Sequence, residues 1–237
     1  MNDNGAAVCR FCGSPLTVGF VDLGMSPLCE SFVSGEHLNE MERFYPLHVY
    51  VCDSCLLVQL EEYVSPDAIF RDYAYFSSYS TSWLEHSKRH VDTMVCRLDL
   101  KRDSRVVEVA SNDGYLLQYF LPHGILPLGI EPAANVAKEA EAKGVPTIVD
   151  FFTADLARRL ARESGPADLI IGNNVLAQVP TLRDFVEGLS ILLGPAGVIT
   201  LEFPHLLRLI DENQFDTIYH EHFSYFSLLA AERVFAA

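Results

Sequence analysis

RVVEVASNDGYLL, at residues 105–117, decides the fold: an apolar run with one acidic residue passes through an Asn-Asp-Gly turn into a second apolar segment. This pattern is typical of a buried strand that leads through a tight loop into a helix. The alternation then repeats, with strand-like stretches at 126–131, 145–150, 167–173 and 197–203 and helix-like stretches between them. Repeated strand–helix pairs predict an α/β fold with a parallel, doubly wound sheet.

The composition favours small molecules or proteins as partners. Lys and Arg number 17 against 32 Asp and Glu, so the formal net charge is −15. A field of this sign repels phosphate, and we expect no nucleic-acid partner. The sequence has no apolar run of about 18 residues. The N-terminus also lacks a signal-peptide pattern. We therefore expect no membrane partner, a cytoplasmic location and a monomer that acts on a small-molecule substrate.

The first 75 residues contain the clearest metal-binding pattern. Short extended pieces such as LHVYVC at 47–52 are interrupted by Gly, Pro and Ser, and four of the six cysteines form two C-x-x-C pairs. Each pair presents two sulfurs on one tight turn, which suits tetrahedral zinc, and Gly13 supplies a residue that tolerates positive φ. Four ordinary core cysteines, or an iron–sulfur cluster, are the weaker alternatives. The expected ligands of a structural Zn²⁺ are Cys9, Cys12, Cys52 and Cys55.

A cofactor site is expected at the carboxyl ends of the predicted strands. Glu131 follows the loop of residues 110–114 by about 20 residues, the spacing at which a carboxylate binds a ribose diol in nucleotide-binding folds. The loop lacks the G-x-G-x-x-G pattern that holds a pyrophosphate, so a nucleoside cofactor without phosphate, S-adenosylmethionine, fits best. The expected cofactor residues are Glu108, Ser111, Asn112, Gly114, Glu131, Asp150, Phe151 and Asn174. A helix-capping role for Glu108 and a core role for Phe151 stay open.

The motifs together resemble the zinc-containing, S-adenosylmethionine-dependent sugar C-methyltransferases of deoxysugar biosynthesis. Besides the cysteine pairs, the resemblance rests on DYAYFSSYSTSW at 72–83, EVASNDGYL at 108–116, GIEPAANVA at 129–137, NNVLAQVP at 173–180 and YHEHFSYFS at 219–227, in family order. It implies a Rossmann-like methyltransferase sheet with a small N-terminal zinc-binding domain. The implied domains are a zinc-binding domain at 1–75, a cofactor-binding methyltransferase domain at 76–203, and at 204–237 the start of a catalytic and substrate region.

The resemblance also implies a reaction and its residues. In this family a keto-deoxysugar nucleotide loses the proton beside its ketone, and the enolate carbon accepts the methyl group. His222 would be the base, with Glu221 orienting it or contacting the substrate and Tyr219 bonding the sugar. The implied substrate contacts are Tyr73, Tyr75, Ser78 and Gln178, the last at a position where the family commonly has His. Glutamine can hydrogen-bond there but cannot titrate near neutral pH.

Other functions stay open at this point. An O- or N-methyltransferase of another metabolite would share the cofactor site. A zinc ribbon alone could bind nucleic acid or protein, although the net charge of −15 disfavours the first. The chain ends at AERVFAA, where the family continues into a further domain, so an inactive, truncated cofactor-binding fragment is a third expectation. A second metal site on His220, Glu221 and His222 is disfavoured, since neighbouring side chains diverge.

Overall fold

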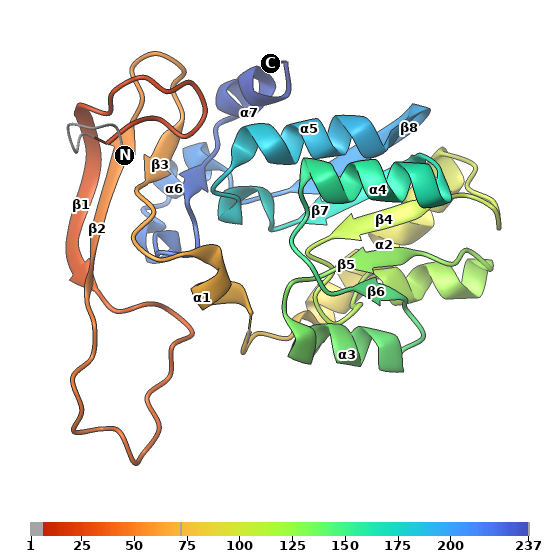
Figure 1. Cartoon of the computed structure of the whole chain (residues 1–237), viewed down its shortest axis with the longest axis horizontal. Coiled ribbons are helices and arrows are strands. Elements are labelled where there is room, and N and C mark those ends of the chain that lie inside the picture. The colour runs from red at the N-terminus through yellow and green to blue at the C-terminus, as the bar shows by residue number, and fades with distance from the viewer. Residues whose placement is uncertain (1–6, 72, 237) are drawn as a thin grey trace. The chain divides into compact units, whose positions relative to one another are not determined.

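The structure is a computed structural model that describes residues 7–71 and 73–236. Figure 1 shows its course, which divides into two compact units. The first, here called the cysteine unit, has its described residues within Met1–Ile69, Leu176–Arg183 and Phe203–Ala237. The second, the parallel-sheet unit, comprises Phe70–Val175 and Asp184–Glu202. The sequence motifs of the expected metal site therefore lie in one unit and those of the expected cofactor loop in the other.

The parallel-sheet unit contains the sheet that the alternation predicted. Its strands are β4 (Val106–Val109), β5 (Leu128–Ile130), β6 (Thr147–Ile148), β7 (Ala167–Asn173) and β8 (Leu193–Glu202). They are ordered β6-β5-β4-β7-β8, and every neighbouring pair is parallel. The chain proceeds outward from β4 in one direction and returns to the other side with β7. Ligands of such sheets bind beside this switch point, at the carboxyl ends of the strands.

Helices cover both faces of this sheet, as the doubly wound pattern predicts. The helices are α2 (Thr81–Arg97), α3 (Ala134–Ala142), α4 (Ala154–Ser164) and α5 (Leu182–Leu192), with 3₁₀ helices η1 (Ser77–Tyr79) and η2 (Leu117–His123). One apolar core joins residues of α2, η2 and α3 to β4 and β7. The helices α4 and α5 lie beside each other on the other face, where Arg158 of α4 pairs with Glu187 of α5 (Figure 1).

The helix predicted after the Asn-Asp-Gly turn is only a short 3₁₀ helix. Pro122 lies inside η2, and Gly124 ends it with a left-handed φ of 74°. Proline removes a backbone donor and its ring clashes with the preceding turn, so an α-helix cannot continue there. The segment nevertheless buries Leu117 and Phe120 completely. The apolar pattern thus predicted the burial correctly and the helix type wrongly.

The cysteine unit is built on an antiparallel sheet. Its strands are β1 (Val18–Ser26), β2 (Tyr45–Val51), β3 (Val58–Leu60) and β9 (Ser224–Tyr225), in that order. Short helices complete it: α1 (Pro66–Phe70), η3 (Leu176–Gln178), α6 (Leu206–Asp211), η4 (Phe215–Thr217) and α7 (Leu228–Phe235). The last strand, β9, comes from the motif at 219–227, which places that motif directly beside β3. Among the described residues, no helix is both long and apolar enough to cross a membrane.

Candidate functional site

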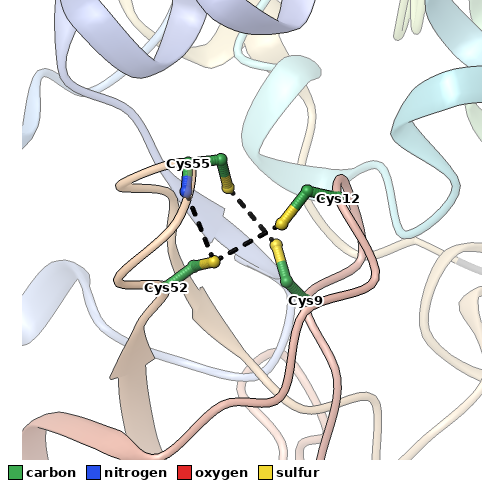
Figure 2. Close-up of side chains that lie close together, drawn as sticks. All are labelled: Cys9, Cys12, Cys52 and Cys55. Carbon is green, nitrogen blue, oxygen red and sulfur yellow. Dashed lines mark hydrogen bonds between the residues drawn. The ribbon is translucent and has the colours of Figure 1, made fainter.

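The four paired cysteines converge on one point in the cysteine unit. Figure 2 shows their thiols directed toward one another. The Sγ atoms of Cys9 and Cys55 are 3.5 Å apart, as are those of Cys12 and Cys52, and all four lie within 4.8 Å of one another. Four sulfurs on zinc with bonds of about 2.3 Å would be separated by about 3.8 Å. The donor set therefore fits a tetrahedral Zn²⁺, and its closed set of four ligands fits a structural ion.

The two turns that carry these thiols have the same backbone design. In the first, the N–H of Gly13 donates to the carbonyl of Cys9 at 2.9 Å, and in the second Leu56 donates to Cys52 at 2.9 Å. Both turns end with a left-handed residue, at φ 77° for Gly13 and 65° for Leu56. Glycine adopts this conformation without cost, whereas leucine is strained there. Gly13 was predicted from the sequence, whereas nothing in the sequence indicates the left-handed conformation of Leu56.

A buried glutamine supports the first turn from β3. The side-chain amide of Gln59 donates from Nε2 to the sulfur of Cys9 at 3.1 Å, and its Oε1 accepts from the backbone N–H of Arg10 at 2.8 Å. Hydrogen bonds of this kind hold metal ligands in place and stabilise the thiolate form. Gln59 was not predicted from the sequence, because its position on a strand gives no sign of the contact.

The expected cofactor loop lies at the carboxyl end of β4. Glu131 is buried, and its carboxylate accepts from the backbone N–H groups of Asn112 and Ala133, at 2.9 Å each. Burial raises the pKa of Glu131, while these two hydrogen bonds act in the opposite direction. The carboxylate thus fixes the loop after β4 to the end of β5. Each oxygen accepts one bond and can accept another.

Near the carboxyl ends of β4 and β7 and in the loop after β4, several buried polar atoms have no hydrogen-bond partner. Both carboxyl oxygens of Glu108, the hydroxyl of Ser111 and the amide nitrogen of Asn173 lack a hydrogen bond among the described residues. Desolvation raises the pKa of Glu108 well above its ordinary value, and the nearby charges of Glu131 and Asp113 add to the effect. The Tyr115 phenol lowers this pKa somewhat, although its contact falls short of hydrogen-bond geometry. Unsatisfied buried groups are costly, so this cluster fits a polar ligand.

Two glycines allow the backbone around this cluster to pack closely. A Cβ at Gly129 would lie 2.4 Å from the Oγ of Ser111. Gly114 has a φ of 72°, and a Cβ there would lie 3.1 Å from that of Ala140 in α3. Gly114 is therefore explained by the turn and by its packing against α3. The expected contact of Gly114 with the cofactor stays a prediction.

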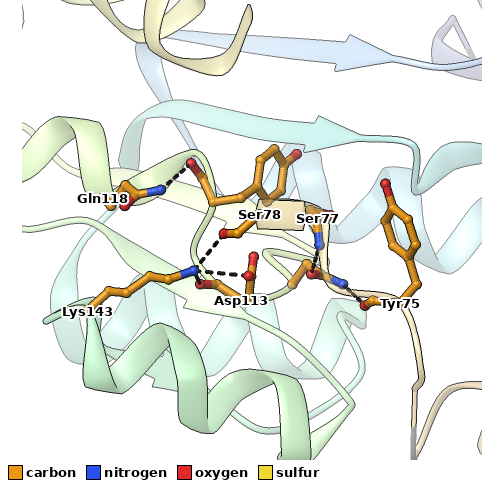
Figure 3. Close-up of polar contacts among 8 residues, drawn as sticks. Tyr75, Ser77, Ser78, Asp113, Gln118 and Lys143 are labelled. Carbon is orange, nitrogen blue, oxygen red and sulfur yellow. Dashed lines mark hydrogen bonds and ion pairs between the residues drawn. The ribbon is translucent and has the colours of Figure 1, made fainter. Parts of the chain in front are cut away.

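The loop is also fastened from the segment before α2, as Figure 3 shows. The side chain of Asn112 accepts from the N–H of Ser77 at 2.8 Å and donates to the carbonyl of Tyr75 at 3.1 Å. Lys143 pairs with Asp113 at 3.0 Å and donates to the hydroxyl of Ser78 at 2.7 Å. Of the expected site residues, Asn112 and Ser78 thus have structural partners. Lys143 was missed, since a lysine at a helix end is ordinary.

Of the remaining expected residues of the parallel-sheet unit, Tyr73 and Tyr75 lie between α1 and η1, and the others follow strands. Tyr73 exchanges backbone hydrogen bonds with the side chain of Asn135, and its ring contacts that of Tyr75 edge to face at 6.4 Å. Asp150 accepts from the N–H of Phe151 at 2.9 Å after β6. Asn174 is exposed, has a left-handed φ of 54° and donates to the carbonyl of Glu202 at 2.7 Å. Asp72, the first residue of the motif at 72–83, lies outside the described residues.

The motif Tyr219-His220-Glu221-His222 lies in the cysteine unit. The imidazole of His222 is buried, with Nδ1 at 2.9 Å from the carbonyl of Thr217 and Nε2 at 3.2 Å from the Tyr219 hydroxyl. Because Nδ1 faces a carbonyl, it carries the proton of the neutral ring and Nε2 is left as the basic atom. Burial lowers the pKa of His222, which favours this neutral form.

The neighbours of His222 are held by other contacts. The Nε2 of His220 is 3.1 Å from the carbonyl of Pro46, and burial lowers the pKa of His220. Glu221 accepts from the thiol of Cys29 at 2.9 Å. No second group of convergent metal ligands occurs in residues 7–71 and 73–236. Gln178 is half-buried in η3.

Comparison with known proteins agrees with both units. Residues 9–70 match a family described as a zinc binding domain, and residues 81–237 match one described as a methyltransferase domain. The chain is 39% identical to the C-methyltransferase NovU of Streptomyces niveus over 220 residues, which is 93% of this chain and 52% of NovU. It therefore spans about half the length of that relative.

Solved structures share the fold of a large part of the chain. An Archaeoglobus fulgidus S-adenosylmethionine-dependent methyltransferase superposes with a TM-score of 0.54 at 14% identity, covering 65% of this chain and 67% of the other. The PH0226 protein of Pyrococcus horikoshii gives 0.55 at 14% identity and covers 75% and 89%. At these identities the likeness concerns the fold alone. The predicted fold class, zinc site and cofactor are confirmed.

Proposed function

The chain belongs to the methyltransferase domain family, and from this premise we propose that it methylates a carbon atom of a keto-deoxysugar nucleotide. The cofactor of the domain is S-adenosylmethionine, whose sulfonium group supplies an electrophilic methyl. Carbon beside a ketone becomes nucleophilic only after a base removes its proton. The observation that carries the proposal is the imidazole of His222, which is buried, neutral and held by Thr217 so that its Nε2, beside the Tyr219 hydroxyl, is the basic nitrogen.

The parallel-sheet unit supports the cofactor part of the proposal. Glu131 would bind the ribose hydroxyls through the acceptor capacity that its two backbone contacts leave. Glu108, with both oxygens unsatisfied, and Ser111, with an unsatisfied hydroxyl, would lie beside the charged methionine part. An ammonium group there would compensate the buried carboxylate, which no described side chain does. Asp150 and Phe151, after β6, would flank the adenine.

In the proposed reaction, one proton moves from the substrate to His222. The Nε2 lone pair of His222 takes the α-proton of the ketone, and the electrons of that C–H bond form the enolate. S-adenosylmethionine, held by Glu108 and Glu131, would supply the methyl group to the enolate carbon as an electrophile, with S-adenosylhomocysteine as the coproduct. The proton remains on His222 until solvent removes it. Tyr219, whose hydroxyl is 3.2 Å from Nε2, would hydrogen-bond the sugar or the developing enolate oxygen.

Glu221, Tyr73, Tyr75, Ser78 and Gln178 remain proposed substrate contacts. Of these, the Tyr75 side chain is the most exposed, at 46%, and is therefore the most available. Ser78 already accepts from Lys143 and can still donate its own proton. Zinc takes no part in the chemistry, because four thiolates leave no open coordination position.

The test is the position of the transferred methyl. The protein is incubated with methyl-¹³C S-adenosylmethionine and a panel of keto-deoxysugar nucleotides, and the product carbon that bears the label is identified by NMR. A new carbon–carbon bond beside the ketone is the expected result. A label on oxygen or nitrogen would instead favour the alternative, an O- or N-methyltransferase.

A further inference from the structure

The side chain of Arg10 connects the zinc site to the segment that contains His222. Arg10 lies inside the first cysteine turn, between Cys9 and Cys12. Its Nη1 donates to the carbonyl of Pro180 at 3.1 Å, and its Nη2 donates to the carbonyl of Leu60. The planar guanidinium also lies over the ring of Phe223, with 5.3 Å between its central carbon and the ring centroid.

These contacts converge on one part of the cysteine unit. Leu60, whose carbonyl accepts from Arg10, donates its own N–H to the carbonyl of Phe223 at 3.0 Å. The two residues before Leu60 continue this pairing in the ladder between β3 and β9, where Gln59 pairs with Ser224 and Val58 with Tyr225. Arg10 therefore holds both the strand to which the segment pairs and the ring of the residue that follows His222. Phe223 is 1% exposed, so its ring has little freedom to adopt another position.

We propose that Arg10 is a positioning residue, which orients the imidazole of His222 through the ring and backbone of Phe223. The proposal rests on the proposed function, in which His222 is the base. It assigns the first cysteine turn a role in the reaction besides metal binding: the turn presents the guanidinium to the segment. A displacement of about 1 Å at a reacting group lowers rates by up to about a hundredfold, so a small change of the ring position suffices.

Arginine suits this role better than lysine. A guanidinium is planar, so it can stack on Phe223 while two of its nitrogens donate to different carbonyls. Lysine keeps the charge, but its three donors lie on one nitrogen, which cannot reach the carbonyls of both Pro180 and Leu60 while it covers the ring. Arg10→Met keeps an apolar chain of similar length and removes every donor. Arg10→Lys and Arg10→Met should therefore show graded effects.

Arg233 provides a matched control. It lies on α7, is exposed, and donates to the carbonyl of Ser54 at 3.4 Å, inside the second cysteine turn. It thus contacts the backbone of one zinc-binding turn, whereas Arg10 lies inside the other, and among the described residues it makes no hydrogen bond, ion pair or cation–π contact with the segment of His222. If an arginine beside the zinc site contributes only to stability, its replacement changes the unfolding of the protein and nothing else. Arg10→Met and Arg233→Met would then differ only in their unfolding.

The test measures the base directly as well as the reaction. The ring nitrogens of His222 are assigned by ¹⁵N NMR in the full chain, and zinc content and S-adenosylmethionine affinity are measured alongside. For Arg10→Met we expect zinc content and cofactor affinity within twofold of the wild type. We further expect the His222 ring signal to shift in Arg10→Met. The rate at which a keto-deoxysugar nucleotide exchanges its α-proton should fall by about tenfold to a hundredfold. Both effects should be smaller in Arg10→Lys and absent in Arg233→Met.

The result that would overturn the proposal is a zinc-loaded Arg10→Met protein in which the His222 signal and the exchange rate are those of the wild type. If Arg10→Met loses zinc, the test uses Phe223→Leu instead, since this variant removes the ring and leaves both carbonyl contacts of Arg10. A wild-type His222 signal and a wild-type exchange rate in Phe223→Leu would then overturn the proposal. A wild-type protein without any proton exchange would refute the proposed function, while the ring signal would still report whether Arg10 positions His222.

Discussion

The backbone N–H of Asn112 donates to the carboxylate of Glu131 at 2.9 Å, so the loop after β4 is held by the residue that follows β5. The two residues come from neighbouring strands and meet at the edge of the sheet where ligands bind in this fold. Asn112 has a left-handed φ of 49°, a conformation that the loop must keep in order to point this N–H at Glu131. Glu131, which we propose binds the ribose, therefore also determines the shape of the loop beside it.

Glu131→Ala should weaken S-adenosylmethionine binding by about 1.5–3 kcal/mol, the range of a hydrogen bond to a charged group. The loss would combine the ribose contact with the freedom that the loop gains. Calorimetry measures it, and Glu139→Ala, an exposed glutamate on α3, is the control that should leave the affinity unchanged. An unchanged affinity in folded Glu131→Ala would mean that the cofactor binds elsewhere.

Glu108→Gln should stabilise the parallel-sheet unit increasingly as the pH rises. The pKa of Glu108 is raised well above its ordinary value by burial. Above about pH 4.3, the ordinary pKa of glutamate, the unfolded chain therefore holds fewer protons than the folded one. The wild type must then lose stability until the pH reaches the raised pKa, and the glutamine variant loses none through this group.

The single tryptophan, Trp83, reports on this unit because it stacks on Tyr115 with 5.9 Å between ring centroids. Urea unfolding followed by its fluorescence should show equal stabilities of Glu108→Gln and the wild type near pH 4, and a gap that widens toward neutral pH. The exposed substitution Glu141→Gln should not produce such a gap. A gap of the same size at every pH would contradict the assignment of a raised pKa to Glu108.

Purified protein should contain roughly one zinc ion per chain, and Cys9→Ser should lower both zinc content and folded yield, since metal binding and folding are coupled in small domains. Elemental analysis measures the metal. Cys96→Ser is the matched control, because Cys96 is exposed and is not one of the four converging cysteines. Full zinc occupancy in Cys9→Ser would remove this residue from the ligand set.

Cys29 should react slowly with iodoacetamide, and Glu221→Gln should accelerate that reaction. Burial raises the pKa of the Cys29 thiol, and its hydrogen bond to Glu221 and the charge of that carboxylate raise it further. Removing the charge lowers the pKa and increases the thiolate fraction, which is the form that reacts. Mass spectrometry of the labelled peptides in the zinc-loaded protein gives both rates. Equal rates in the two proteins would show that Glu221 does not act on the thiol.

The sheet and the metal site could be predicted because each depends on a local pattern. Five apolar stretches separated by helical ones specify a parallel sheet, and paired C-x-x-C turns specify a tetrahedral site. The left-handed Leu56 could not be predicted, since leucine is unfavourable there and only the metal-binding turn requires it. The 3₁₀ form of η2 was also missed, although Pro122 gave a local signal for it.

The sequence predicted where the proposed site residues lie along the strands, but not the contacts that they make. The end of a strand places Glu108 and Glu131 at the ligand-binding edge, whatever their partners are. The side chain of Asn112 binds the backbone at Tyr75 and Ser77, in a segment far away in the sequence. The contacts of Arg10 with Pro180 and Phe223 have the same origin. Tertiary packing decides such pairs, and no spacing rule encodes them.

The central claim, that His222 makes an enolate before the methyl is transferred, is tested most directly by exchange of the substrate's α-proton in deuterated water. NMR of a keto-deoxysugar nucleotide should show exchange with the wild type and with His37→Ala, an exposed control histidine, and none with His222→Ala. Because burial lowers the pKa of His222, the wild-type rate should fall with acid only below about pH 6.5, the ordinary histidine value. A folded His222→Ala protein that binds S-adenosylmethionine and exchanges the proton at the wild-type rate would contradict the account.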